Sequence, residues 1–156
     1  MSTNAHRVAD NIAWNLQIMV PTLANRKRFR QYDPWDLEPG DQSGEIRAFY
    51  VEWSGSSEDV EPTDLFDRVS DHEYEIRIKY PTIDSSYQNL QRVILQDRHD
   101  INNTLRNPDL WVGYSKTQTT ADIGLWNRKR IGDEIVRDDD SWEFVSRWLC
   151  VIQEVE

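Results

Sequence analysis

Two short stretches gather side chains that can carry acid–base or metal chemistry. The run Asp97–Asp100, Asp-Arg-His-Asp, places two carboxylates beside an imidazole, and His72 stands between Asp71 and Glu73. Histidine and carboxylates bind zinc and act as general acids and bases. Neighbouring residues of a helix or a strand point in different directions, so neither stretch brings its side chains together. We therefore interpret the first as a solvated helix face with local ion pairs, and we favour a structural role for His72.

Three further features lack the pattern that their chemistry requires. Asp138, Asp139 and Asp140 form an acidic run without the glycine and distal glutamate of a calcium loop, so we predict a charged hairpin tip. Cys150 lies among apolar residues, which indicates a small buried side chain rather than a nucleophile. The sequence contains no glycine-rich phosphate loop, no Gly-x-Ser-x-Gly and no His-Glu-x-x-His. We predict no catalytic residue, no metal, no cofactor and no enzyme activity.

Composition narrows the class of protein. The chain has 156 residues, the size of one domain, so we predict a single domain over residues 1–156. A formal net charge of −10 argues against a free-standing nucleic-acid binder, which normally has a basic surface. One cysteine excludes an internal disulfide and suits a reducing compartment. No signal peptide and no membrane span are expected, because no apolar run is long enough.

One stretch organises the elements that would position these residues. From Tyr74 to Tyr80, aromatic and branched residues alternate strictly with charged ones, and Pro81 follows. A period of two is typical of a strand with one buried and one wet face, and proline cannot continue the ladder. We predict this to be a central antiparallel strand, with Glu73, Glu75, Arg77 and Lys79 on the wet face.

Two amphipathic helices are predicted, one before this strand in the sequence and one after it. Apolar residues at spacings of three and four indicate helices over Asn4–Met19 and about Tyr87–Arg106. Pro21 and Pro108 follow their ends, where the residue before proline avoids the helical region. The first helix begins after good capping residues.

Further strands complete the sheet. They are predicted at Asn25–Tyr32 as a basic edge, at Glu45–Trp53 with Phe49, Val51 and Trp53 facing the core, at Leu110–Tyr114, and as a hairpin of Ile131–Arg137 and Trp142–Val155. Apolar residues on both sides of the last strand predict a helix over one face and a neighbouring chain over the other. Mobile loops are expected at about residues 33–44, 54–70 and 116–130. The fold class is α+β, a mostly antiparallel sheet with two main helices on one face.

Charge is unevenly distributed, which suggests contacts between copies of the chain. Residues 58–75 hold eight acids and one base, whereas four of residues 26–30 are basic. Complementary patches steer assembly, so the basic segment of one copy is expected to meet the acidic stretch of the next copy. The alternative interpretations of the basic segment are that it contacts phosphates or that its charges keep an edge strand soluble. Tryptophan is enriched at interface centres. The interface candidates are Arg26, Lys27, Arg28, Arg30, Trp35, Trp126, Arg128, Lys129 and Arg130. The acidic candidates, for an interface or a ring lumen, are Glu58, Asp59, Glu61, Asp64, Asp138, Asp139 and Asp140.

This arrangement resembles the tail terminator proteins of long-tailed bacteriophages, a group that includes tail-completion and minor tail proteins. The matching features are the order of elements over nearly the whole chain. They are the helix Asn4–Met19, the long loops Asp33–Gly44 and Ser54–Ser70, the strand Tyr74–Tyr80 ending in Tyr-Pro, the helix Ser86–Arg106 and the hairpin Ile131–Val155.

The resemblance implies a structural virion protein, assembled in the host cytoplasm. Such a protein forms a hexameric ring on the last ring of the tail tube, stops tube growth and joins the head-completion or neck protein. Its acidic lumen lets DNA pass without specific binding, which agrees with the charge of −10. The alternatives are another head–tail connector or stopper, a tail tube protein, a small acidic adaptor, or an enzyme whose site is assembled from scattered acids.

Overall fold

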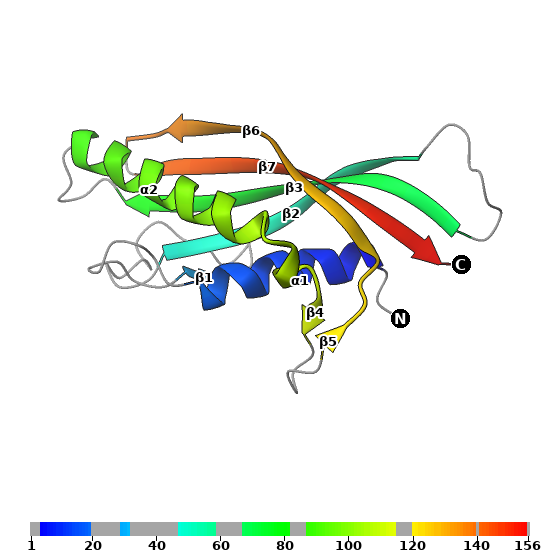
Figure 1. Ribbon diagram of the computed structural model, residues 1–156. Coiled ribbons are helices and arrows are strands. Elements are labelled where there is room, and N and C mark those ends of the chain that lie inside the picture. The colour runs from blue at the N-terminus through cyan, green and yellow to red at the C-terminus, as the bar shows by residue number, and fades with distance from the viewer. Residues whose placement is uncertain are drawn as a thin grey trace.

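A computed structural model describes residues 4–19, 29–31, 47–58, 67–81, 87–114, 120–139 and 141–155. Two long helices lie among strands of very different lengths (Figure 1). In chain order the elements are α1 (Asn4–Ile18), β1 (Phe29–Gln31), β2 (Arg47–Glu58), β3 (Asp67–Pro81), α2 (Tyr87–Leu105), the 3-10 turn η1 (Pro108–Leu110), β4 (Gly113–Tyr114), β5 (Thr120–Ala121), β6 (Leu125–Arg137) and β7 (Ser141–Val155).

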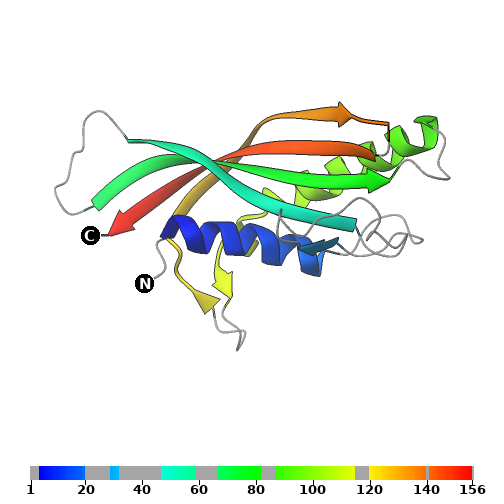
Figure 2. The same cartoon turned by 180° about the vertical axis from the view of Figure 1, so that it is seen from behind.

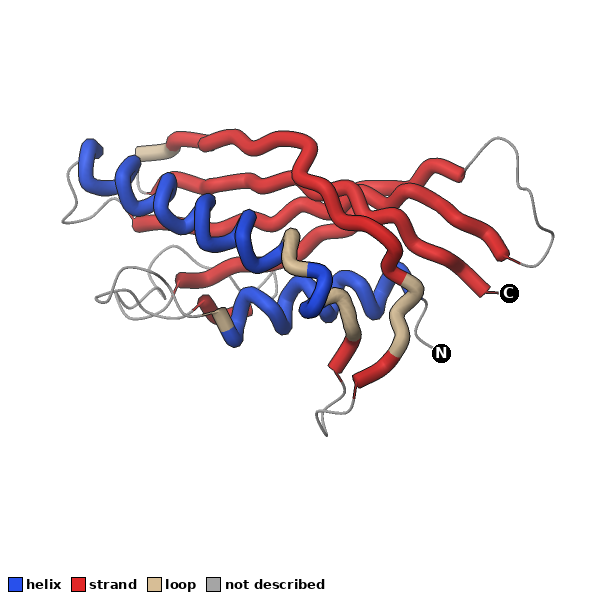
Figure 3. Tube along the Cα trace, viewed as in Figure 1, coloured by secondary structure: helices blue, strands red, loops and turns tan. Residues whose placement is uncertain are grey.

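The main sheet has the strand order β1-β2-β3-β7-β6. β1 runs parallel to β2, and every other neighbouring pair is antiparallel. The sheet is twisted, and α1 and α2 both pack on one of its faces, as the front and back views agree (Figures 1 and 2). β4 and β5 form a separate two-stranded ribbon below the helices (Figure 3). The predicted α+β class, with a mostly antiparallel sheet and helices on one face, is confirmed.

The alternation along β3 sets the two faces of the sheet. Tyr74, Ile76, Ile78 and Tyr80 are buried against the helices, while the odd-numbered residues between them are only partly buried. β3 pairs with β2 on one side and with β7 on the other, so it is a central strand as predicted. We call the helix-free side, which carries these odd-numbered residues, the open face.

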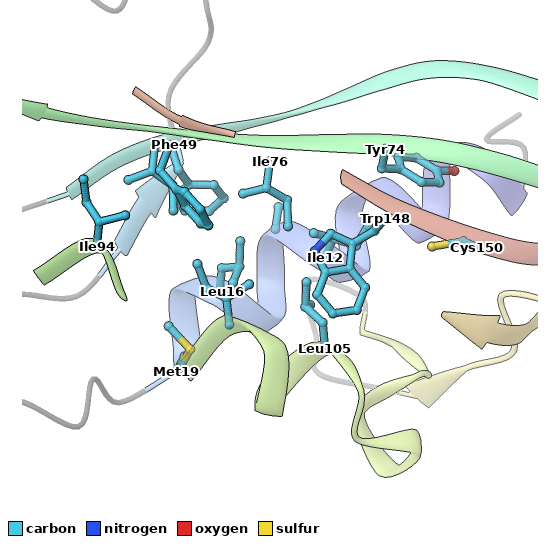
Figure 4. Packing of buried hydrophobic residues seen from close by; sticks show 14 of the residues in the cluster. Ile12, Leu16, Met19, Phe49, Tyr74, Ile76, Ile94, Leu105, Trp148 and Cys150 are labelled. Carbon is cyan, nitrogen blue, oxygen red and sulfur yellow. The ribbon is translucent and has the colours of Figure 1, made fainter. Parts of the chain in front are cut away.

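The core lies between the helix-facing side of the sheet and the two helices (Figure 4). α1 contributes a stripe that includes Ile12 and Leu16, both without solvent exposure, and α2 contributes Ile94 and Leu105. Trp148 of β7 is the largest fully buried side chain, and its indole N–H donates to Ser146 Oγ at 2.8 Å. Both predicted helices are confirmed to within one residue at each end.

Two predicted loops are wrong in part because strand pairing overrides polar local sequence. Residues 54–58 continue β2 and residues 67–70 begin β3, where the two strands remain paired. Residues 125–130 begin β6 and pair with β7, since an edge strand tolerates charged residues. The predicted strand Leu110–Tyr114 is reduced to β4, because η1 occupies its start. The predicted loop at residues 33–44 lies outside the described residues.

Trp53 also departs from the prediction. It lies on the predicted face with Phe49 and Val51, since it pairs with Tyr74 and donates to the buried His72, but it is 53% exposed whereas Phe49 is buried. The register shifts immediately after Trp53, at a bulge containing Gly55, whose φ of +148° suits glycine. The strand keeps its pairing with β3 beyond the bulge, where Ser56 and Ser57 are exposed.

Candidate functional site

The open face carries a network of ion pairs across four strands. Arg77 of β3 donates to Glu143 of β7 (Nη1–Oε1, 2.6 Å) and to Glu75 (Nη2–Oε2, 2.7 Å). Glu75 also accepts from Nε of Arg147 of β7 at 3.2 Å, and Arg147 Nη2 donates to Glu134 of β6. The network therefore ties β3, β7 and β6 together; a longer contact of 3.5 Å from Arg77 to a glutamate of β2, Glu52, extends it.

Both arginines of the open face are held in the charged form. Partial burial alone would lower the pKa of Arg77, but hydrogen bonds to Glu143 and Glu75 outweigh burial and raise the pKa above its ordinary value. The hydrogen bond to Glu134 likewise raises the pKa of Arg147. Because these carboxylates already accept from guanidinium groups, the arrangement stabilises the sheet rather than supplying a free general base.

Val145 lies on the open face of β7 beneath these charges. It has no solvent exposure, and Arg77 and Glu134 flank it on the neighbouring strands. The prediction that a neighbouring chain covers this side is therefore wrong for Val145, because side chains of its own chain cover it. Leu149 and Val151, farther along the same face, remain partly exposed.

We expect Glu75→Gln to lower the free energy of unfolding by about 1–2 kcal/mol, because one neutral amide cannot satisfy two guanidinium groups. The matched control is Glu73→Gln, on the same strand and face, where Glu73 makes no ion pair with any described residue. That control should change stability by less than about 0.5 kcal/mol. Urea unfolding measures both. Equal effects from the two substitutions would contradict a special role for Glu75.

His72, for which a structural role was favoured, is buried on the helix-facing side of the sheet, where it lies between Trp53 and Ser70 in a chain of hydrogen bonds. The Trp53 indole N–H donates to His72 Nδ1 at 3.0 Å, and His72 Nε2 lies 2.9 Å from Ser70 Oγ. Since Nδ1 accepts, a neutral His72 carries its proton on Nε2 and donates it to Ser70. An imidazole in this tautomer cannot take a proton from the serine, so the pair is not poised as a nucleophile and base.

The interpretation of the Asp97–Asp100 run as a solvated helix face is wrong for its two aspartates. Asp97 is 1% exposed and accepts from the Tyr80 hydroxyl at 2.7 Å. Asp100 is also buried, whereas His99 is exposed and lies 3.0 Å from the Asn103 amide nitrogen. Both aspartates are buried because they extend the apolar stripe of α2, and Asp97 contacts Tyr80 of the sheet.

Arg128, predicted at a subunit interface, is buried inside the chain. Its side chain is 3% exposed, and Nη2 donates to Asn11 Oδ1 of α1 at 2.6 Å. The Asn11 amide donates to the carbonyls of Leu110 (3.0 Å) and Val112 (2.6 Å), and Asn15 donates to Asn11 Oδ1 at 3.1 Å. This buried polar cluster joins α1, β6 and the segment after η1. The interface prediction for Arg128 is therefore wrong.

The guanidinium group of Arg128 is a buried cation with few hydrogen-bond partners. Among the described residues, Arg128 Nε and Nη1 have no hydrogen-bond partner. Burial lowers the pKa of Arg128. Burial also raises the pKa of the Cys150 thiol, which lies directly opposite on β7, although the positive charge of Arg128 acts to lower the pKa of this thiol. Cys150 has no solvent exposure, which fits the predicted buried side chain.

The other basic and aromatic candidates lie on edge strands of the sheet or outside the described residues. Trp126 is 58% exposed on β6, and its indole donates to Gln153 Oε1 at 3.1 Å. Lys129 is exposed, whereas Arg130 donates to Asp133 at 2.8 Å. Arg30 lies in β1, at the sheet edge as predicted, and its side chain is not described. Arg26, Lys27, Arg28 and Trp35 lie outside the described residues.

The acidic candidates are separated at the two ends of the sheet. Asp138 and Asp139 are exposed at the β6–β7 turn, as predicted for a hairpin tip. They line an open depression of about 540 Å³ with Arg137 and Trp142, in which the guanidinium lies 4.8 Å from the indole centre. Glu58 ends β2 at the opposite end. Asp59, Glu61, Asp64 and Asp140 lie outside the described residues.

Sequence reasoning missed the two polar clusters. Asn11 and Asn15 are four residues apart beside the apolar stripe of α1, which is a signal for one shared helix face. Ser70 and His72 are two residues apart on one strand and hence on one face. Neither spacing identifies the distant partner, Arg128 or Trp53.

Among the described residues, no three His, Cys, Asp or Glu side chains gather into a group that could hold a metal ion. Neither α1 nor α2 combines the length and the apolar content needed to cross a membrane. Comparison with known proteins adds no relative: no family model matches the chain, and no curated protein matches it significantly.

Proposed function

We propose that this chain is a structural subunit that closes into a ring with copies of itself, ending the tail tube of a long-tailed bacteriophage and joining it to the head. The order of helix, strands, helix and final hairpin, with both helices on one face, is the order on which the resemblance to tail terminators rests. The role is one of geometry, in which one face of the ring binds the tube end and the other lacks the surface for further stacking.

The observation that carries the proposal is the pair of unpaired sheet edges on opposite sides of the molecule. Within the described residues, β6 pairs only with β7, and β2 has no outer partner after Phe49. A ring requires head-to-tail contacts between two different surfaces of each subunit. Three of the exposed large apolar residues, Trp126, Ile131 and Val136, lie on β6, and Trp53 lies on β2.

Charge supports the same proposal. The chain carries a net charge of −10, and Asp138 and Asp139 are exposed at the hairpin tip. An acidic surface around a channel repels phosphate and lets DNA slide. We therefore propose that DNA passes through the ring without specific binding, and that the partners are the tail tube and head-completion proteins.

Native mass spectrometry with negative-stain electron microscopy tests this function. Flat closed rings of six copies are expected at micromolar concentration. Spontaneous long tubes would instead identify a tail tube protein, and a monomer at all concentrations would overturn the ring.

We expect Arg28→Glu with Arg30→Glu to weaken self-association while leaving the subunit folded, because the substitutions remove the attraction to the acidic stretch. Light scattering measures the assembled mass, and circular dichroism the fold. The matched control is Arg92→Glu with Arg106→Glu, which makes the same charge change at two exposed positions at either end of the α2 region. An unchanged mass in the first variant, or an equal loss in the control, would contradict specific charge pairing.

A further inference from the structure

The free part of β2 differs from an ordinary protected edge. After Phe49 this strand continues to Glu58 and pairs only with β3 among the described residues. Residues 50–58 contain no lysine, arginine or proline, the residues that usually block pairing at an edge, and their only charges are Glu52 and Glu58. Ser54, Ser56 and Ser57 are exposed, and such small side chains leave the main chain accessible. This edge is suited to an added strand.

Trp53 stands in the middle of this edge and is uncovered because α1 crosses the sheet obliquely. The first turn of α1 lies over β3 and β7, where Ala5 O accepts from the Tyr74 hydroxyl at 2.6 Å and Asn4 donates to Gln153 O. The end of α1 lies against β1 and β2 (Figure 2). Trp53 lies near the start of α1, where the helix covers β3 and β7 but not β2. The indole is therefore left 53% exposed.

The indole is nevertheless held in place. Its N–H donates to His72 Nδ1 at 3.0 Å, and its ring lies 6.2 Å from the imidazole at 44°. His72 is 4% exposed and is fixed in turn by Ser70, which is 3% exposed. The bulge at Gly55 turns the strand directly after this residue, and bulges of this kind re-aim a side chain. An aromatic ring immobilised before binding loses little entropy when it binds.

We propose that residues 50–58 of β2, with Trp53 as the anchor, dock the basic segment Arg26–Arg30 of a second copy of this chain. The inference rests on the proposed self-assembly and names the contact that carries it. The edge is negative and the segment is positive, so the charges are complementary. Phe29 and Arg30 belong to β1, which pairs with β2 of its own copy along one side only among the described residues. The other side of β1 can therefore add main-chain hydrogen bonds to the edge of a second copy, and an arginine can stack on the face of an indole.

A labelled peptide of residues 24–32 tests the docking directly by fluorescence anisotropy. The receptor is the full chain carrying Arg28→Glu with Arg30→Glu, whose own segment cannot compete. We expect this receptor to bind the peptide, and Trp53→Ala in the same background to weaken binding about tenfold or more. Leu95→Ala, which removes a side chain on α2 that is 54% exposed, is the matched control and should leave binding unchanged. No binding, or equal binding after Trp53→Ala, would overturn the proposal.

Self-association of the otherwise unaltered chain separates this inference from the ring itself. If the chain forms rings and Trp53→Ala forms them with the same affinity, the docking edge is wrong and the ring stands. If the chain stays monomeric but the peptide binds through Trp53, the docking edge stands and the ring is wrong. Circular dichroism of each variant confirms that a loss of binding is not a loss of fold.

Discussion

Replacing Asn11 by alanine is expected to lower the free energy of unfolding by about 3–5 kcal/mol, among the largest single-residue effects in this chain. Asn11 is 2% exposed and supplies the acceptor, at 2.6 Å, for the buried guanidinium of Arg128. It also satisfies the carbonyls of Leu110 and Val112. Alanine would remove the partner of a buried cation and of the Val112 carbonyl, whereas the Leu110 carbonyl would still accept from Asn15 at 3.1 Å. Urea unfolding followed by circular dichroism measures the loss.

Arg128→Met provides the decisive control because it removes the cation and keeps most of the side-chain volume. Alone, it should change stability by less than about 1 kcal/mol or increase it, since two guanidinium nitrogens already lack described partners. Combined with Asn11→Ala, it should restore about 1–2 kcal/mol of the loss. A double variant no more stable than Asn11→Ala would show that the buried charge is not the cause.

Replacing Gly124 by alanine is expected to cost about 2–4 kcal/mol, because the position combines a left-handed backbone with a close approach. Its φ is +68°, and an added Cβ would lie 2.5 Å from Gln153 O and 2.8 Å from Asn4 Nδ2. The same Gln153 carbonyl accepts from Asn4 at 2.7 Å, so the first turn of α1 should loosen with the substitution. Thermal unfolding measures the cost, and amide exchange in the first turns of α1 measures the loosening.

Gly132→Ala is the matched control for this effect. Gly132 lies in the same strand region, has no positive φ, and an added Cβ meets no atom within 4 Å. We expect alanine there to be neutral or slightly stabilising, because it restricts the unfolded chain. Equal destabilisation at the two positions would contradict the assignment of strain to Gly124.

The periodic elements could be predicted because their local pattern and their tertiary environment agree. β3 alternates in sequence and alternates in burial from Ser70 to Tyr80, and α1 buries the stripe that its spacing defines. Strand ends were not predictable in the same way. Residues 54–58 are mostly serine, glycine and glutamate, and they are strand only because β3 supplies a paired partner.

The individual site residues were harder to predict than the fold because their environment depends on distant elements. The sequence shows three consecutive basic residues at 128–130, but α1 covers the first, the second is exposed on the open face, and the third pairs with Asp133. Trp53 continues the alternation of Phe49 and Val51, yet the bulge and the oblique path of α1 leave it exposed. The burial of Arg128 and the exposure of Trp53 both depend on the path of α1, which is distant from both positions in the sequence.

The pairing of β3 with β7 has a consequence for how the chain folds during synthesis. Its register joins Asp67 to Val155 and Pro81 to Ser141, so α2, β4, β5 and β6 all lie between the two halves of the central ladder. Long-range pairing of this kind makes folding slow. During synthesis on the ribosome, the edge of β3 that pairs with β7 stays unpaired until β7 has been synthesised. A product cut before Ser141 would lack β7, which joins β3 to β6, and so would be a substrate for chaperones and proteases.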